Sequence, residues 1–170
     1  LNNSVGIFKI GIIGPESTGK STLANYLAHR YNGELVPEYA REYMEQLAPT
    51  YEYTYQDVVH IARIQIEQLK ELHSSSTEGI PKGYRSDIVV FDTELIITKV
   101  WFLHKFGHCP EFLEEALHAY PMDVYLLCYP DMEWEPDPVR ENPNIREYLF
   151  DWYKKEIETL DIPYYIIRHE

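Results

Sequence analysis

The sequence predicts an α/β fold, a doubly wound five-stranded parallel sheet with helices on both faces. Three observations predict it: five short runs rich in apolar residues, helical segments between them, and a glycine turn that joins the first run to the first helix. Continuous apolar runs are typical of parallel strands covered on both faces, and right-handed crossovers connect such strands. At 170 residues, 45% of them hydrophobic, the chain suits a single domain, residues 1–170.

The first strand and the first helix follow each other directly. The run "IFKIGII", residues 7–13, stops at Gly14, which indicates a buried strand that enters a tight turn. The segment from Gly19 to about Tyr31 then carries apolar side chains at intervals of four residues. This spacing predicts a helix.

A very short second strand and a long helix come next. Pro37 limits the strand in "ELVPEYAREY". The helix begins near Thr54, with Asp57 in capping-box order. One apolar stripe follows along it: Val58, Ile61, Ala62, Ile66, Leu69 and Leu72. The polar stretch "HSSSTEGIPKGYRS", residues 73–86, indicates a surface loop.

The second half of the chain supplies three more strands and two helices. The strands are expected in "DIVVFDTE" (87–94), "DVYLLCYP" (123–130) and "IPYYIIRHE" (162–170). One helix is expected in "LIITKVWFLHKFG" and another with Asn142 as its N-cap and Pro143 at its first position.

Composition excludes several classes of partner. The net charge of −13 repels a polyphosphate backbone, so a nucleic-acid partner is not expected, and a small-molecule substrate is. Two cysteines are too few for a disulfide framework and suit a reducing compartment. The chain shows no basic leader and no apolar run of about 18 residues, so we expect a cytoplasmic protein without a membrane span.

The stretch "GPESTGKST" decides the chemistry. Residues 14–21 match G-x-x-x-x-G-K-[ST] between a predicted strand and a predicted helix, the context that a P-loop requires. Backbone N–H groups and the positive end of the helix would surround the phosphates of ATP, Lys20 would reach the β and γ oxygens, and Ser21 would ligate Mg²⁺. The expected nucleotide-binding residues are Gly14, Ser17, Thr18, Gly19, Lys20, Ser21 and Thr22.

A P-loop needs a second magnesium anchor at the end of a neighbouring strand. The run "VVFDTE" places Asp92 there, with Glu94 as a weaker candidate. An aspartate that ends a strand also serves in many proteins as a helix N-cap, and "DTEL" permits that alternative.

Several longer segments resemble the ribosylnicotinamide kinase domain of the NadR family and the AAA-type domains grouped with it. They are "GPESTGKSTL", "VPEYAREY", "TYQDVVHIARIQ", "VVFDTE" and "EWEPDPVRE". The resemblance spans Lys9 to about Glu147. It implies an ATP-dependent kinase that phosphorylates the 5′-hydroxyl of nicotinamide riboside to give nicotinamide mononucleotide.

Phosphoryl transfer needs a carboxylate to take the acceptor's proton and cations to spread the developing charge. Glu38 follows the second strand and is the expected base, with Asp92 as the alternative. Residues 131–146, "DMEWEPDPVRENPNIR", have the composition of a mobile lid, from which Arg140, and after it Arg146, would reach the γ-phosphate. The alternative is an ordinary surface loop.

The acceptor side is expected to combine polar and aromatic residues. Glu16 would face the acceptor from the P-loop, or is simply a solvated acid, and Arg41 would pair with Glu38 or the acceptor, or form a surface ion pair. Gln65 interrupts an apolar stripe and would bind substrate, or is a satisfied core residue. Aromatic residues in or near the crevice would hold a planar pyridinium: Tyr39, Tyr43, Trp101 and Trp134.

Two other functions stay open. One is a different small P-loop kinase, acting on a nucleoside or a sugar alcohol. The other is a regulatory module that binds ATP or GTP and hydrolyses it slowly. A kinase requires an acceptor pocket, whereas a switch requires loops that face a partner.

Overall fold

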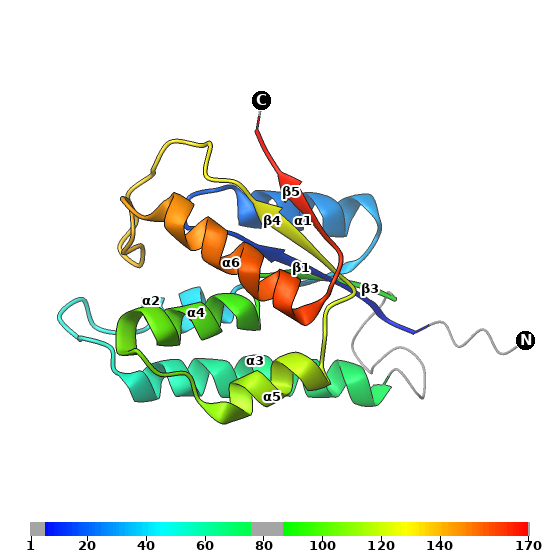
Figure 1. Ribbon diagram of the computed structural model, residues 1–170, viewed down its shortest axis with the longest axis horizontal. Helices are drawn as coiled ribbons and strands as arrows, with labels where there is room; N and C mark the ends of the chain where they lie inside the picture. Colours follow the sequence, from blue (N-terminus) through cyan, green and yellow to red (C-terminus); the bar gives the residue numbers. More distant parts are fainter. Residues whose placement is uncertain (1–5, 76–86, 170) are drawn as a thin grey trace, which may run out of the picture.

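The predicted five-stranded parallel sheet is confirmed. The computed structural model describes residues 6–75 and 87–169. Its strands run in the order β2-β3-β1-β4-β5, and all neighbouring pairs are parallel (Figure 1). Their bounds are β1 Phe8–Ile13, β2 Glu34–Val36, β3 Ile88–Asp92, β4 Val124–Cys128 and β5 Tyr164–Ile167.

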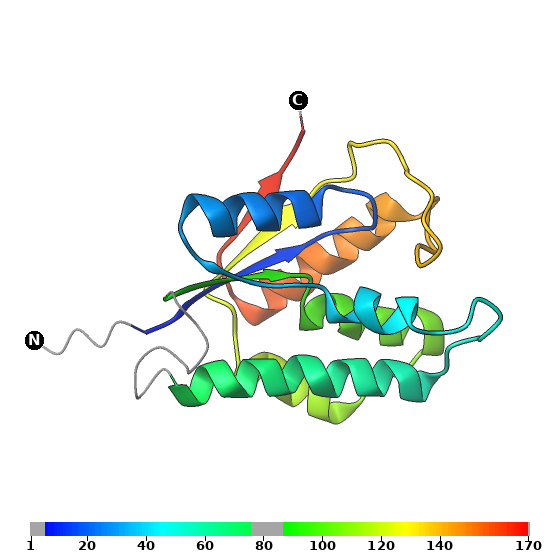
Figure 2. The same ribbon diagram turned by 180° about the vertical axis from the view of Figure 1, so that it is seen from behind.

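Helices cover both faces of this sheet, but unequally. They are α1 Lys20–Arg30, α2 Tyr39–Glu45, α3 Tyr55–Ser75, α4 Leu95–Phe106, α5 Glu111–Ala119 and α6 Arg146–Leu160. Figure 2 shows α1 on one face, with α3, α4 and α6 on the other. The helices thus form two layers around the sheet, as a doubly wound fold requires.

Two hydrophobic cores follow from this arrangement. A small core lies under α1 and includes Ile12, Ala24 and Val90. A larger core lies on the opposite face, where the apolar stripe predicted for α3 packs with residues of α4, α5 and α6. The alternating faces of the central strands therefore supply both cores.

Some local structure differs from the expectation. The helix predicted to start at Asn142 begins at Arg146, because residues 143 and 144 form a separate turn and Ile145 is the N-cap. Helices α2 and α5 were not predicted, although the acidic first turn of α5 after Pro110 is a helix-start signal. Of the predicted loop 73–86, the first three residues belong to α3 and the others lie outside the described residues.

The start of α3 is as predicted. The helix begins at Tyr55, and the backbone N–H of Thr54 donates to the carboxylate of Asp57 at 2.7 Å. This contact is half of a capping box and fixes where the long helix enters the core. Within residues 6–75 and 87–169, every helix is too short or too polar to cross a membrane.

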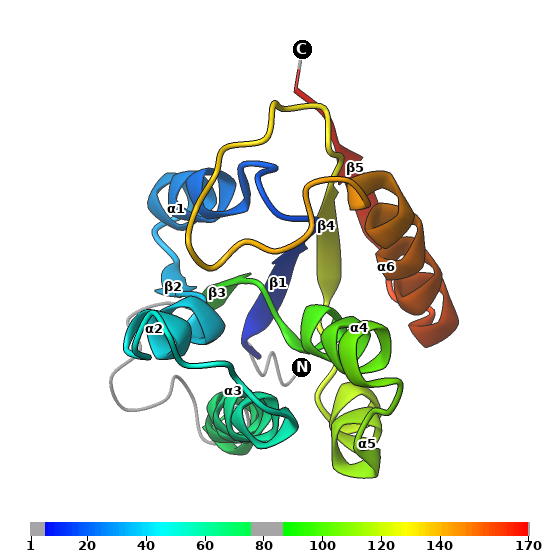
Figure 3. The same cartoon turned by 90° about the vertical axis from the view of Figure 1, so that its left-hand side faces the viewer.

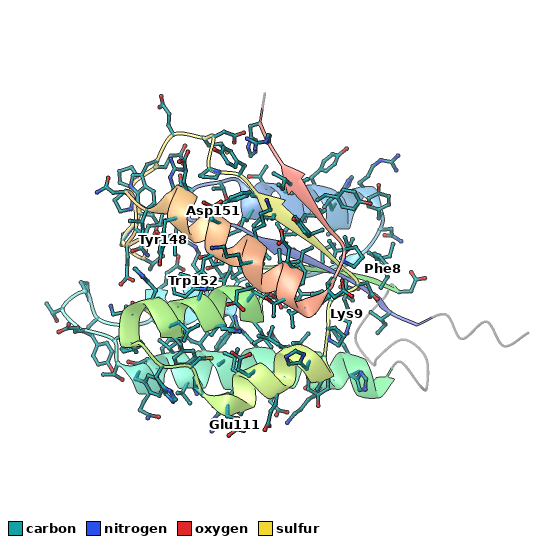
Figure 4. The ribbon with its side chains drawn as sticks, in the orientation of Figure 1. Phe8, Lys9, Glu111, Tyr148, Asp151 and Trp152 are labelled. Carbon is teal, nitrogen blue, oxygen red and sulfur yellow. The ribbon has the colours of Figure 1, made fainter. Side chains whose placement is uncertain are left out.

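The carboxyl ends of β1 and β3 lie side by side at the centre of the sheet. The register pairs Ile12 with Asp92, so the turn after β1 and the end of β3 meet. Figure 3 looks onto this edge and shows the segment between β4 and α6 crossing in front of it. Figure 4 places Phe8 and Lys9 at the other end of β1, away from that segment. A crevice at the carboxyl edge is the usual ligand site of such sheets.

Candidate active site

The P-loop lies between β1 and α1 and is held by its own side chains. Thr18 Oγ1 and Lys20 Nζ both donate to the carbonyl oxygen of Pro15, each at 2.8 Å. Gly14 has to be a glycine, because an added Cβ would lie 2.7 Å from the carbonyl oxygen of Cys128. Gly19 has φ +79°, which favours glycine at the turn into the helix. The loop therefore presents Lys20 at the positive end of α1.

The two predicted magnesium ligands are in direct contact. Ser21 Oγ donates to Asp92 Oδ2 at 2.6 Å, although the two residues are 71 positions apart. The other carboxylate oxygen of Asp92, Oδ1, is buried and has no hydrogen-bond partner. A hydroxyl and a carboxylate are hard oxygen donors of the kind that Mg²⁺ accepts alongside phosphate and water. These residues therefore fit the ion.

Glu94, the weaker metal candidate, has a structural role. Its side chain accepts the N–H of Ile96 at 2.8 Å and caps α4, so Asp92 is not the cap. Only 4% of Glu94 is exposed. Burial raises its pKa to about 7, against the opposing effect of its hydrogen bonds.

A cavity of about 580 Å³ opens beside the P-loop. The P-loop, α2, α4, α6 and the residues just before α3 and just after β3 line it, together with the segment that the sequence predicts to be a lid, residues 131–146, called the lid segment below. The polar lining residues include Glu16, Lys20, Glu38, Arg41, Tyr53, Thr93, Trp101, Lys105, Glu141 and Asn142. A cavity of this volume accommodates a nucleoside next to the phosphate-binding loop.

Glu38 projects into this cavity from the N-cap position of α2. Burial raises its pKa, and the nearby positive charge of Lys20 opposes that effect. Burial also lowers the pKa of the Lys20 ammonium, with Glu38 as the largest opposing charge. The charges of Glu38 and Lys20 therefore interact across the cavity. This interaction places a carboxylate near the P-loop end of the cavity.

Glu16 differs from the expectation that it binds an acceptor hydroxyl or a basic residue. It lines the cavity, but its carboxylate accepts backbone N–H groups of the lid segment. Glu141 N lies 3.1 Å from both carboxylate oxygens, and Asn142 N lies 2.9 Å from Oε2. Glu16 is thus partly exposed, and its carboxylate is bound by the backbone of the lid segment.

Arginines hold the lid segment at other points. Arg146 donates to the carbonyl oxygens of Ser17 at 3.1 Å and Met132 at 2.9 Å, so it reaches the P-loop. Arg140 instead donates within the segment, to the carbonyl oxygen of Glu135. The Arg41 guanidinium pairs with two carboxylates, with Nη1 2.9 Å from Asp137 Oδ2 and Nε 3.9 Å from Glu38 Oε2. Arg41 therefore forms partly exposed ion pairs, including the expected one with Glu38, and it also lines the cavity.

The aromatic residues at the cavity are largely different from those expected. Tyr53 and Trp101 pack edge to face with ring centroids 5.3 Å apart, and Lys105 Nζ lies 3.9 Å from the Tyr53 ring centroid. Trp101 was among the expected aromatics, whereas Tyr53 was missed. Tyr53 lies directly before the capping box of α3 and contacts Trp101 of α4. The sequence does not predict this contact, because it forms only when the two helices pack together.

Three expected substrate residues lie elsewhere. Gln65 is buried and accepts the hydroxyl of Thr98 at 2.7 Å, so it is a satisfied core residue. The hydroxyl oxygen of Tyr39 lies 3.3 Å from Nε2 of His60. Trp134 packs in the lid segment with the Arg146 guanidinium 5.9 Å from its ring centroid. None of the three is among the residues that line the cavity within the described chain.

A further contact on the P-loop comes from the end of β5. His169 donates its backbone N–H to Asp131 at 2.7 Å, and its Nδ1 lies 2.9 Å from the same carboxylate. An added Cβ at Gly19 would lie 3.1 Å from His169 Nε2 and 3.2 Å from Met132 Sδ. Glycine at this position therefore permits these residues to approach the loop, an arrangement that the motif alone does not reveal.

Comparison with known proteins agrees with this geometry. A protein family described as AAA domain matches residues 9–170. The chain belongs to this AAA domain family. The trifunctional NAD biosynthesis/regulator protein NadR of Escherichia coli strain K12 is 24% identical over 131 residues, which are 77% of this chain and 30% of that protein. The NadR protein of Salmonella typhimurium matches equally well. The chain thus spans less than a third of these relatives.

Solved structures show the same fold. A NadR protein in complex with NR superposes with a TM-score of 0.69 at 23% identity, over 94% of this chain and 43% of that chain. Deoxyadenosine kinase from M. mycoides superposes with a TM-score of 0.62 at 14% identity, over 94% of this chain and 90% of that chain. The chain therefore has the fold of a P-loop kinase, and the resemblance to the NadR kinase domain is confirmed.

Proposed function

We propose that this protein transfers the γ-phosphate of ATP to the 5′-hydroxyl of a nucleoside, with nicotinamide riboside as acceptor and nicotinamide mononucleotide as product. One observation carries the proposal. A single cavity joins the P-loop lysine, Lys20, to a half-buried carboxylate, Glu38, and continues to an aromatic wall at Tyr53 and Trp101. This is the order in which a kinase needs its donor, its base and its acceptor.

The P-loop side would bind the nucleotide. Backbone N–H groups ahead of α1 and the ammonium of Lys20 would hold the β and γ oxygens, in place of the carbonyl of Pro15 that Lys20 now contacts. Ser21 and Asp92 would hold Mg²⁺, which supplies charge neutralisation between the β and γ phosphates when bound. Arg146 donates to the Ser17 carbonyl of the loop and would add positive charge.

Glu38 would receive the proton. The 5′-oxygen forms a bond to the γ-phosphorus while the bond between that phosphorus and the β–γ bridging oxygen breaks, so ADP leaves. The hydroxyl proton passes to the Glu38 carboxylate, whose raised pKa makes it a better acceptor than an ordinary glutamate. Asp92 is a poorer base because its Oδ2 accepts the Ser21 hydroxyl.

The aromatic wall favours a cationic ring. The Tyr53 face already attracts one cation, the Lys105 ammonium, and the Glu141 carboxylate lies 3.5 Å from that ammonium. A pyridinium carries the same charge on a flat ring, and the flexible lysine side chain is able to yield its place. The NadR structure with NR supports the same class of acceptor by similarity.

Release of ADP tests the proposal. Purified protein with Mg-ATP is offered nicotinamide riboside, adenosine, uridine or no acceptor. We expect nicotinamide riboside to give the fastest release, together with a phosphorylated nucleoside in equal amount. Equal release with and without every acceptor would indicate a nucleotide switch. A faster reaction with another nucleoside would keep the kinase and change its acceptor.

A further inference from the structure

We propose that Glu16 is a positioning residue that builds the acceptor wall through the backbone of the lid segment. The inference rests on the proposed kinase function and extends it. Glu16 belongs to the phosphate-binding loop, yet its carboxylate accepts the N–H groups of Glu141 and Asn142, which are 125 and 126 residues away in sequence. It would therefore make acceptor binding depend on a residue of the donor loop.

The contact explains why a phosphate-binding loop contains an acid. A free carboxylate beside a triphosphate would repel it, but a carboxylate that accepts two N–H groups has its charge stabilised by them. Glu141 N lies within 3.1 Å of both oxygens and Asn142 N within 2.9 Å of one. The negative charge is thus directed to the lid segment, while the neighbouring loop residues stay available to phosphate.

The consequence appears at Glu141, whose side chain lies on the acceptor side. Its carboxylate accepts the Tyr53 hydroxyl at 2.8 Å, and the Tyr53 oxygen accepts the N–H of Trp101 at 3.0 Å. All three residues line the cavity. A continuous set of hydrogen bonds therefore runs from Glu16 through the backbone of residue 141 to the aromatic wall.

Other contacts hold the lid segment at different points. Ser17 Oγ donates to the carbonyl oxygen of Glu133 at 3.2 Å and accepts the N–H of Glu135 at 3.0 Å. Arg41 pairs with Asp137 at 2.9 Å. These contacts hold residues 133–137, whereas Glu16 holds residues 141 and 142, which line the cavity. Removing Glu16 would release the backbone of residues 141 and 142 and leave the rest of the segment attached.

Two pairs of variants test this role. The first pair is Glu16→Ala and Glu16→Gln, each compared with wild type. Alanine removes both carboxylate oxygens. Glutamine keeps one acceptor oxygen and replaces the other by an NH2 group, which cannot accept the N–H of Glu141. The second compares Asn142→Pro with Asn142→Ala, because both lack the asparagine side chain and only proline lacks the N–H. Asn142 precedes Pro143, which restricts it to extended backbone that proline also adopts.

We expect the KM for the nucleoside acceptor to rise roughly tenfold or more in Glu16→Ala, less in Glu16→Gln, with the Kd of Mg-ATP within about a factor of two of wild type. The KM should also be higher in Asn142→Pro than in Asn142→Ala. Hydrogen exchange of the amides of residues 141 and 142, measured without any acceptor, should accelerate in Glu16→Ala.

Three kinetic or binding outcomes would overturn the proposal: weaker Mg-ATP binding as the main defect of Glu16→Ala, an unchanged acceptor KM, or an equal acceptor KM in the two Asn142 variants. Failure of the proposed function looks different. In that case wild type phosphorylates no nucleoside, and the exchange measurement still reports whether Glu16 holds residues 141 and 142. Unchanged exchange in Glu16→Ala would refute the contact by itself.

Discussion

The two halves of the site are built in different ways. The donor half is one contiguous loop, residues 14–21, together with Asp92 on the neighbouring strand. The acceptor half takes Glu38 from α2, Tyr53 from the entrance of α3, Trp101 from α4 and Glu141 from the lid segment. The donor half works mainly through backbone groups in a fixed local turn, whereas the acceptor half works through side chains that meet only in the folded protein. We therefore expect substitutions in the donor half to have larger effects.

The largest effect is expected for Lys20→Ala. Lys20 is the only lysine of residues 14–21, and its ammonium would bind the β- and γ-phosphate oxygens, on either side of the P–O bond that breaks. Turnover should fall by at least about 10³-fold, and Mg-ATP should bind more weakly. Steady-state kinetics and calorimetry measure both quantities. Lys70→Ala, on the exposed side of α3, is the control, and equal loss in both variants would contradict the role of Lys20.

The next effect concerns the pH dependence of the protein's stability and comes from Glu94, the N-cap of α4. Burial raises the pKa of Glu94 to about 7, against an ordinary value of 4.5. Between these values the folded protein keeps a proton that the unfolded chain releases, so the free energy of unfolding falls as pH rises, by up to roughly 3 kcal/mol. Glu94→Gln keeps an acceptor for the N–H of Ile96 and should remove this part of the pH dependence.

Urea unfolding at pH 5 and pH 7.5 measures the difference. The control is Glu111→Gln, at the exposed start of α5 (Figure 4). It should keep the pH dependence of wild type. If the free energy of unfolding of Glu94→Gln fell as much as that of wild type between the two pH values, the Glu94 carboxyl would not cause the pH dependence.

The same contrast explains what the sequence predicted. The P-loop and the pairing of Ser21 with Asp92 were predictable, because a motif fixes the first and the topology of a parallel sheet brings the strand ends together. The start of α3 was predictable because its cap is local. Glu38 was expected in the crevice for the same topological reason, since it follows β2.

The acceptor wall was not predictable in the same way. Tyr53 and Glu141 meet across 88 positions, and nothing local marks either residue as a cavity residue. The helix start expected at Asn142 was wrong: the backbone of Asn142 is bound by a distant carboxylate, Glu16, and the helix begins four residues later. Gln65 was expected to bind substrate, but it accepts the hydroxyl of Thr98 inside the core. Long-range contacts decide such positions.

A smaller effect than that of Lys20 is expected for Glu38→Gln. Loss of the proton acceptor should lower kcat about 10²-fold while Mg-ATP binding stays intact. Because burial raises the pKa of Glu38, the wild-type kcat should rise with pH through a value above the usual range of glutamate, and the variant should lack this limb. Glu42→Gln, at an exposed position one turn further along α2, is the control. Loss of ATP binding in Glu38→Gln would remove its assignment as the base.

The smallest effect is expected for Tyr53→Phe. The variant keeps the ring and loses only the hydroxyl that donates to Glu141 and accepts from Trp101. Of these two bonds, the one to Glu141 joins the aromatic ring to the lid segment; a net hydrogen bond contributes about 1 kcal/mol, so the KM of the acceptor should rise about fivefold, with kcat and the KM of ATP nearly unchanged. Tyr51→Phe is the matched control, because the Tyr51 hydroxyl donates to Asp57, at the start of α3 and outside the cavity lining. An equal rise in both variants would mean that loss of a tyrosine hydroxyl acts through the stability of α3. A rise in the KM of ATP for Tyr53→Phe alone would mean that the two halves of the site are not separate.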